Sequence, residues 1–165
     1  MSDIETDSGA LDTDIVEVRS LQTGDLDWVA RIDEAHTGRN RRDYLRVKLV
    51  EAERDTGMRI SLAARIEDIP AGFLLGRLYF GEFGVPEPVA VLDTVGVAMD
   101  FAGRKVAKAL MRQMLMQLRA LRIEKVETEV GWEETELMSF LRAAGFRPAP
   151  RLCLDLPVAD AAWLD

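Results

Sequence analysis

The chain has 165 residues, of which 48% are hydrophobic and 30% are charged, a balance typical of one globular domain with a well-formed core. Its formal net charge of −8 is uneven, because residues 1–14 carry five acids and no base, whereas the remainder carries 24 acidic against 21 basic residues. The mildly acidic remainder argues against nucleic-acid binding, and no apolar run approaches the ~20 residues of a membrane span.

The N-terminal segment predicts an acidic disordered tail over residues 1–13, followed by a single domain over residues 14–165. It has neither the basic start nor the apolar stretch of a signal peptide, so we expect a cytoplasmic protein. The one cysteine, Cys153, cannot form an internal disulfide, in agreement with a reducing compartment, and we expect it in the core of a late strand.

In chain order, alternation of apolar and charged residues predicts a half-buried first strand at residues 15–20. A helix is expected at residues 25–34, with Thr23 as its N-cap, and a second helix at residues 43–53. The polar loop between these helices, residues 36–42, contains the densest cluster of arginines in the chain.

Three strand-like runs follow at residues 59–66, 71–80 and 89–97. The first connection, residues 67–70, contains a proline and two acids, and the second, residues 81–88, contains two glycines and two prolines. Strands joined by such connections are expected to form an antiparallel meander.

The C-terminal part is predicted to alternate helix and strand, with helices at residues 104–121 and 133–146 and strands at residues 125–130 and 152–156. Gly145 suits a left-handed cap at the end of the second of these helices. The resulting order, strand-helix-helix-strand-strand-strand-helix-strand-helix-strand, contains no internal repeat.

The junction between the strand at residues 89–97 and the next helix has the features of an anion site. A helix start leaves about four backbone N–H groups without an intrahelical partner, and Arg104, Lys105 and Lys108 add positive charge there. A pyrophosphate fits this arrangement. Basic residues beside a helix start are also often only solvated surface, so the order of the residues is more informative than their charge.

The sequence VLDTVGVAMDFAGRKVAKALMRQMLMQL, residues 91–118, resembles motif A of the GCN5-related N-acetyltransferases (GNAT), in which a strand leads through a turn of pattern Arg/Gln-x-x-Gly-x-Gly/Ala into a helix. In this register Ala102 stands at the Arg/Gln position, Lys105 at the first glycine and Ala107 at the last position. The sequence EETELMSFLRAAGF, residues 133–146, resembles motif B, a helix that ends in Gly-Phe.

This resemblance implies an α/β (α+β) protein with the GNAT-like acyl-CoA N-acyltransferase fold, a single mixed and mostly antiparallel sheet flanked by helices. It implies acetyl-CoA as co-substrate, with no metal. Pantetheine would lie between the strands at residues 91–97 and 125–130, with the thioester carbonyl bonded by a backbone N–H around Gly96 or Val97. The implied cofactor-binding residues are Val95, Gly96, Val97, Ala102, Gly103, Arg104, Lys105, Val106, Ala107 and Lys108.

The base that accepts the amine proton is expected to be Asp93, which stands in an otherwise apolar strand where the family often carries a glutamate. A carboxylate there would be partly desolvated, which suits a base acting through water. The alternative, weighed equally, is a structural Asp93 bonded to backbone or to Thr94. Glu129 is the second catalytic candidate, and Glu133 is a weaker one because a helix start alone favours an acid.

The proton source for the leaving thiolate is not evident. The family commonly places a tyrosine in motif B where this chain has Leu141. A thiolate can leave without help, since thiols have a pKa of ~8.5. The only tyrosines are Tyr44 and Tyr79, and either could come close after folding.

The acceptor-binding candidates are Arg39, Arg41, Tyr44 and Trp132. In the family, the segment between the first two helices helps to cover the acceptor pocket, so these arginines could hold a carboxylate or phosphate. The simpler interpretation of each arginine is that it belongs to a solvated helix start. The simpler interpretation of Trp132 is that it is a core aromatic residue. His36 is expected to be a cap or surface residue rather than a base.

We therefore expect a bacterial-type N-acetyltransferase that acts on a primary amine of a small molecule or protein, without nucleic-acid or membrane partners. Late strands of such folds often pair between subunits, which allows a homodimer. The alternative is a catalytically degenerate GNAT-fold module that binds CoA or a protein partner without turnover. Binding of an ordinary nucleotide is less favoured, because no Walker-type or Rossmann-type glycine turn is present.

Overall fold

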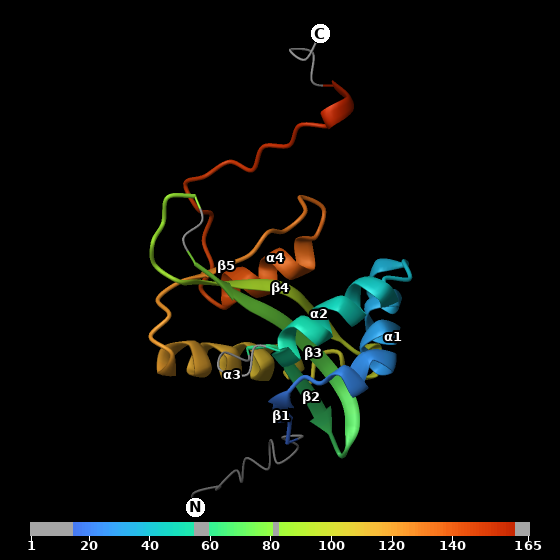
Figure 1. Ribbon diagram of the computed structural model, residues 1–165. Coiled ribbons are helices and arrows are strands. Elements are labelled where there is room, and N and C mark those ends of the chain that lie inside the picture. Colours follow the sequence, from blue (N-terminus) through green and yellow to red (C-terminus); the bar gives the residue numbers. More distant parts are fainter. Residues whose placement is uncertain (1–14, 55–59, 81–82, 161–165) are drawn as a thin grey trace, which may run out of the picture. The chain divides into compact units, whose positions relative to one another are not determined.

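The computed structural model describes residues 15–54, 60–80 and 83–160 (Figure 1), so the predicted tail at residues 1–13 lies outside the described residues. The chain divides into two compact units, one up to Glu129 and the other from Val130 onward. The first unit contains β1 (Glu17–Ser20), η1 (Thr23–Asp25), α1 (Leu26–Thr37), α2 (Arg42–Arg54), β2 (Leu62–Ile66), β3 (Ile69–Tyr79), β4 (Val89–Val97), η2 (Met99–Phe101), α3 (Val106–Ala120) and β5 (Val126–Glu127). The second contains α4 (Thr135–Ala143) and the short η3 (Val158–Asp160).

The sheet of the first unit has five strands in the order β1-β2-β3-β4-β5. The first four pair antiparallel and β4 pairs parallel with β5, so the sheet is mixed and mostly antiparallel, as the sequence predicts. The turn between β2 and β3 is tighter than predicted. It consists of Glu67 and Asp68, both with positive φ, which matches the twist of a hairpin. Pro70 lies already in β3, where an irregular register accommodates it.

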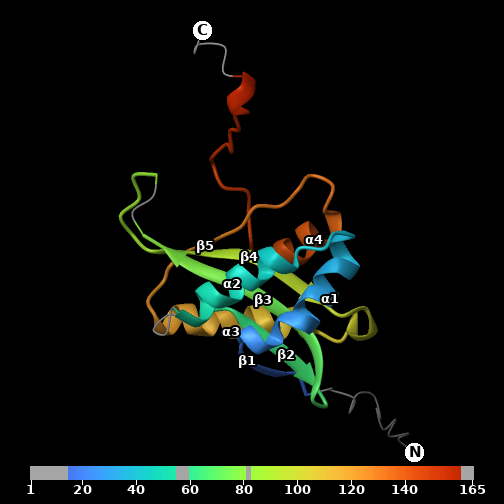
Figure 2. The same ribbon diagram turned by 45° about the vertical axis from the view of Figure 1, so that its right-hand side comes forward.

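Neighbouring residues of β3 point to opposite faces of the sheet and contact different helices. The Phe73 ring packs edge-on against Trp28 of α1, with ring centroids 6.4 Å apart. A side chain at Gly72 would instead meet Val106 and Leu110 of α3. Helices α1 and α2 therefore cover one face and α3 the other, as Figure 2 shows.

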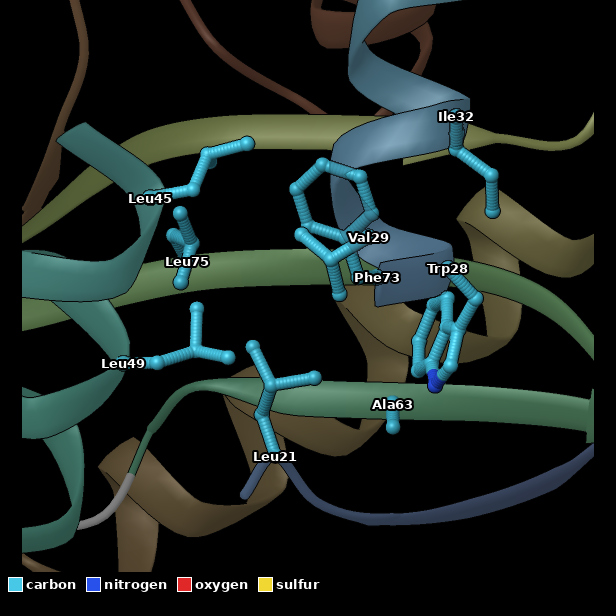
Figure 3. Close-up of a cluster of buried hydrophobic side chains, with 9 residues drawn as sticks. All are labelled: Leu21, Trp28, Val29, Ile32, Leu45, Leu49, Ala63, Phe73 and Leu75. Carbon is cyan, nitrogen blue, oxygen red and sulfur yellow. The ribbon is translucent and has the colours of Figure 1, made fainter. Parts of the chain in front are cut away.

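The core beneath α1 and α2 is a cluster of nine buried apolar side chains (Figure 3). Its members are Leu21, Trp28, Val29, Ile32, Leu45, Leu49, Ala63, Phe73 and Leu75. Burial of each large side chain contributes about 1.5–3 kcal/mol to stability. This cluster fixes the two helices over the middle of the sheet, and it thereby positions the side chains that α1 and α2 direct toward β4.

Four predictions about local structure are wrong. Thr23 is not the N-cap of α1, because it lies in η1 and Asp25 precedes the helix. The strand predicted at residues 125–130 is limited to β5. Residues 152–156 form no strand among the described residues, and Leu152 and Leu154 are 87% and 86% exposed. Cys153 is exposed as well, rather than buried in a late strand.

The remaining elements follow the predicted order. The four predicted helices correspond to α1, α2, α3 and α4, with ends shifted by a few residues. None of the helices in the described part of the chain is long and apolar enough to cross a membrane.

Candidate active site

The connection between β4 and α3 is a compact turn with unusual backbone angles. Gly103 has φ +78°, and Lys105, the residue before α3, has φ +61°. The left-handed conformation favours glycine, which explains why the family pattern has glycine at the Lys105 position. Lys105 was expected to be helical; it precedes the helix, and its side chain is exposed.

This turn presents several backbone N–H groups that have no internal acceptor. The amides of Phe101, Ala102 and Arg104 bond to carbonyls within the turn, and the first amide of α3 that bonds backward is that of Ala109, to Lys105 O at 3.0 Å. Among the described residues no acceptor faces the amides of Gly103, Lys105, Val106, Ala107 and Lys108. Consecutive free amides at a helix start form a concave anion site, to which Lys105 and Lys108 add charge.

The strand that leads into this turn has one edge open toward β5. Backbone pairing between β4 and β5 involves only Ala90 and Val91, and the Thr128 hydroxyl then donates to Leu92 O at 2.8 Å. Beyond Leu92, this edge of β4 has no strand partner among the described residues. Pairing between the two strands thus ends after Val91.

Backbone alternation decides which residues of β4 face the open edge. Ala98 donates its N–H to Ala71 O at 2.8 Å, so the backbone groups of Gly96 also face β3. Those of Val95 and Val97 face the open edge. Of the three β4 residues expected to bind the cofactor, Val95 and Val97 therefore present their amides to the open edge. Gly96 instead leaves room for the Phe73 ring, because a Cβ atom at Gly96 would lie 2.7 Å from that ring.

Asp93 occupies a β-bulge in the middle of β4. Leu75 pairs with Thr94 and Gly76 with Leu92, which leaves Asp93 as the extra residue. Its side chain is exposed, not desolvated as expected. One carboxylate oxygen, Oδ2, accepts hydrogen bonds from the Tyr44 hydroxyl at 2.7 Å and the Thr94 hydroxyl at 3.0 Å. The bulge re-aims this carboxylate, and both hydroxyls bond the same oxygen.

Tyr44 reaches Asp93 from the first turns of α2. Burial raises the pKa of its hydroxyl to about 12, and the hydrogen bond to the Asp93 carboxylate acts in the same direction. Tyr44 therefore remains a protonated donor at neutral pH. The guanidinium of Arg41 lies 5.3 Å from the centre of its ring, and the Lys48 ammonium 5.6 Å.

The arginine cluster before α2 is partly neutralised by α1. Arg41 donates two hydrogen bonds to Asp33, from Nε at 2.9 Å and from Nη2 at 2.5 Å, and this bonding raises the pKa of Arg41. Arg42 pairs with Asp27. Arg39 is exposed, with no carboxylate partner among the described residues. Of the two predicted acceptor-binding arginines, Arg39 alone has a guanidinium outside an ion pair.

His36 also contacts β4, although it was expected to be only a cap or surface residue. Its Nε2 lies 2.6 Å from the carbonyl oxygen of Val97, at the open edge. The side chain is exposed, in the last turn of α1. The carbonyl can only accept, so Nε2 carries the proton in this contact.

The other candidates from the sequence follow β5 in the chain. Glu129 is exposed and follows β5 at the end of the first unit. In the second unit, Trp132 is 94% exposed, so it is not the core aromatic considered as its simpler role, and Glu133 is exposed beside it. Leu141, at the motif B tyrosine position, is buried. Among the described residues no three or more His, Cys, Asp and Glu side chains form a group that could hold a metal.

Comparison with known proteins agrees with this arrangement. The model of the acetyltransferase (GNAT) family matches residues 23–146, which is more than half of the chain. The chain belongs to the GNAT family. No curated protein matches it. Residues 91–118 and 133–146, which resemble motifs A and B, lie inside the matched region.

Solved structures show the same fold at low sequence identity. A CoA complex of the aminoglycoside N-acetyltransferase AAC(6')-Iy has a TM-score of 0.72 at 16% identity and covers 87% of this chain and 95% of its own. A ribosomal-protein-alanine N-acetyltransferase from Brucella melitensis biovar Abortus 2308 has a TM-score of 0.67 at 17% identity. The match covers 87% of this chain and 99% of that protein's chain. An aminoglycoside acetyltransferase from an uncultured soil metagenomic sample, in complex with sisomicin, has a TM-score of 0.63 at 14% identity. The match covers 86% of this chain and 97% of that protein's chain.

Proposed function

We propose that this GNAT protein transfers an acetyl group from acetyl-CoA to a primary amine of a small molecule or of a protein. The observation that carries the proposal is the row of free amides at Gly103 and residues 105–108, which follows directly on the open edge of β4. This is the donor set that a pyrophosphate needs. The solved CoA complex of AAC(6')-Iy, which has this fold, supports CoA as the ligand.

In the proposed reaction the acceptor nitrogen forms a bond to the acetyl carbon while the carbon–sulfur bond breaks and the thiolate leaves. The amine proton passes to Asp93, directly or through one water. Amides of Val95 and Val97 at the open edge would bond the thioester carbonyl and the pantetheine. Glu129 remains the alternative base. No side chain is required to protonate the thiolate, which is a good leaving group.

The proposed acceptor site is built around Asp93, with Arg39, Arg41 and Tyr44 as candidates for contacting the acceptor. A contact between Trp132 and the acceptor remains a prediction from the sequence. Because Arg41 is paired with Asp33, Arg39 is the better candidate for holding an acidic group of an acceptor. An exposed carboxylate beside neutralised arginines also suits a cationic amine. Two of the similar structures are named as aminoglycoside acetyltransferases and one as a ribosomal-protein-alanine acetyltransferase, so both small-molecule and protein amines belong in a screen.

Thermal unfolding with acetyl-CoA, CoA and ATP tests the donor site. Acetyl-CoA at a hundred times its Kd should stabilise the protein by about 2.7 kcal/mol, or roughly 5–10 °C, and ATP should not reproduce the shift. Lys108→Glu should reduce the shift, because it reverses a charge at the turn. Arg112→Glu makes the same charge change one turn later on α3, at an exposed position, and should retain the shift. Equal shifts in both variants, or no shift in the wild type, would exclude this turn as the donor site.

The second candidate, a module without turnover, is favoured by two departures from the family pattern, at Lys105 and at Leu141. Lys105 holds a left-handed conformation at the position where the family has glycine, so its side chain stands beside the proposed pyrophosphate site. Leu141 also removes the family's usual proton donor. Such a module would bind CoA but would produce no acetylated amine from any acceptor in the screen.

A further inference from the structure

A chain of side-chain contacts connects α1, α2 and β4 beside the proposed base. Asp33 of α1 is 3% exposed and accepts two hydrogen bonds from Arg41. The Arg41 guanidinium contacts the Tyr44 ring, and the Tyr44 hydroxyl donates to Asp93. The contacts thus run from a buried anchor to an exposed carboxylate.

Each contact restrains the next one. The fork of Arg41 meets both oxygens of Asp33, which fixes the plane of the guanidinium. The ring of Tyr44 is held by its contacts with Arg41 and Lys48 and is 40% exposed. Asp93 is exposed on a bulged strand, where an unrestrained carboxylate would sample several rotamers.

We propose that Tyr44 is a positioning residue for acetyl transfer, which orients the Asp93 carboxylate toward the acceptor amine and is itself held by the Asp33–Arg41 pair. The inference rests on the proposed function, because it assigns a role relative to the base of that reaction. Tyr44 exchanges no proton in the step. Its hydroxyl proton is engaged with Asp93, so the proton that the amine loses goes to Asp93 and the thiolate leaves unprotonated.

This role differs measurably from direct contact between Tyr44 and the acceptor. Loss of a positioning hydroxyl reduces kcat with little change in KM, whereas loss of an acceptor contact raises KM with kcat retained. The ratio of the change in kcat to the change in KM therefore separates the two roles.

The first experiment compares Tyr44→Phe with Tyr79→Phe. Tyr79 likewise donates to a carboxylate, Glu127, at 2.7 Å, so both variants lose a tyrosine–carboxylate hydrogen bond. We expect Tyr44→Phe to reduce kcat about tenfold or more, with KM nearly unchanged. Tyr79→Phe should behave like the wild type. Unchanged kcat in Tyr44→Phe, or a change in KM alone, would overturn the inference.

A second experiment does not require activity. In Tyr79→Phe, Tyr44 is the only remaining tyrosine, so the ultraviolet signal of a phenolate reports on it alone. Fluorotyrosine incorporated there is more acidic and titrates before alkaline unfolding. Adding Asp93→Asn should lower the titration midpoint of this phenol, because the adjacent negative charge is removed. The same midpoint with and without Asp93→Asn would show that the two groups do not interact.

The outcomes separate this inference from the proposed function. If the wild type neither binds acetyl-CoA nor acetylates any amine, the proposed function fails. The positioning role of Tyr44 in acetyl transfer is then refuted as well. The titration of Tyr44 would still show whether Tyr44 and Asp93 interact. If the wild type is active and Tyr44→Phe matches it in kcat, only the positioning role fails. Stabilisation by CoA should be the same in both proteins, because Tyr44 lies outside the β4–α3 turn.

Discussion

Replacing Gly72 by alanine tests how β3 holds the start of α3. A Cβ atom at Gly72 would lie 2.8 Å from the carbonyl oxygen of Gly96 and 2.8 Å from Cγ1 of Val106. The Gly96 oxygen belongs to the backbone of the paired strand β4, and Val106 is a buried helical valine whose χ1 strongly prefers one rotamer, so neither atom moves away without cost. Overpacking of this kind costs 1–3 kcal/mol, and we expect Gly72→Ala to reduce the free energy of unfolding by about 2 kcal/mol.

For a chain of this length, that loss corresponds to about 4–8 °C in Tm, which calorimetry or circular dichroism can measure. Gly24→Ala is the matched control, because no atom lies within 4 Å of its added Cβ, and it should stay within ~0.5 kcal/mol of the wild type. Gly72→Ala should also weaken stabilisation by acetyl-CoA, since Val106 opens the proposed pyrophosphate site. Equal Tm values for the two variants would refute the packing of β3 against α3 described above.

Three further predictions concern other parts of the structure. Burial alone would raise the pKa of Asp25, but the hydrogen bonds that it accepts from Arg19, Gln22 and Trp28 hold this pKa below its usual range. Asp25→Ala should therefore reduce the free energy of unfolding in urea by about 2 kcal/mol. This loss is smaller than that for a fully buried pair, because the Arg19 side chain is 37% exposed. Glu51→Ala, which breaks an exposed pair at 3.7 Å, should cost under ~0.5 kcal/mol, and an equal loss in both variants would contradict this account. Folding raises the pKa of Tyr44 from 10.0 to about 12, so the folded state keeps this proton to a higher pH than the unfolded state does. The contribution of the Tyr44 hydroxyl to stability is therefore complete below pH 10 and declines toward pH 12. The difference in free energy of unfolding between the wild type and Tyr44→Phe should shrink over this range, and a constant difference would argue against the raised pKa. Lys105→Gly removes the strain of a lysine in the left-handed conformation and should raise the free energy of unfolding by about 0.5 kcal/mol, after the entropy cost of glycine is subtracted. Lys108→Gly, inside α3, should instead lower the free energy of unfolding by about 1 kcal/mol. Changes of the same sign in both variants would refute the backbone argument.

Local sequence patterns predict most of the fold because helices and hairpins are specified by nearby residues. The apolar periodicity of α3 and the turn signal before β3 are local, and both are confirmed. The alternation of Leu152, Leu154 and Leu156 is also strand-like. A strand requires a partner edge, however, and periodicity cannot supply one; these residues are exposed in the structure.

The site was only partly predictable for the same reason. Asp93 could be recognised as a carboxylate in an apolar strand, but its hydrogen bond to Tyr44 joins residues 49 positions apart. The pairing of Asp33 with Arg41 depends on how α1 and α2 are oriented over the sheet, and no spacing rule indicates it. Sequence reasoning therefore missed Asp33, and it did not foresee that His36 would contact Val97.

The most direct test of the proposed reaction is acetylation of an amine panel, including aminoglycosides and peptide N-termini, by the wild type and Asp93→Asn with acetyl-CoA as donor. Mass spectrometry of the products and release of free thiol would be measured together. We predict acetylation by the wild type and a loss of about a hundredfold or more in Asp93→Asn, with stabilisation by CoA retained. Asp68→Asn, an exposed change in the β2–β3 turn, should keep the wild-type rate. Full activity in Asp93→Asn would remove Asp93 from the mechanism, and CoA binding without acetylation of any amine would contradict the proposed reaction itself.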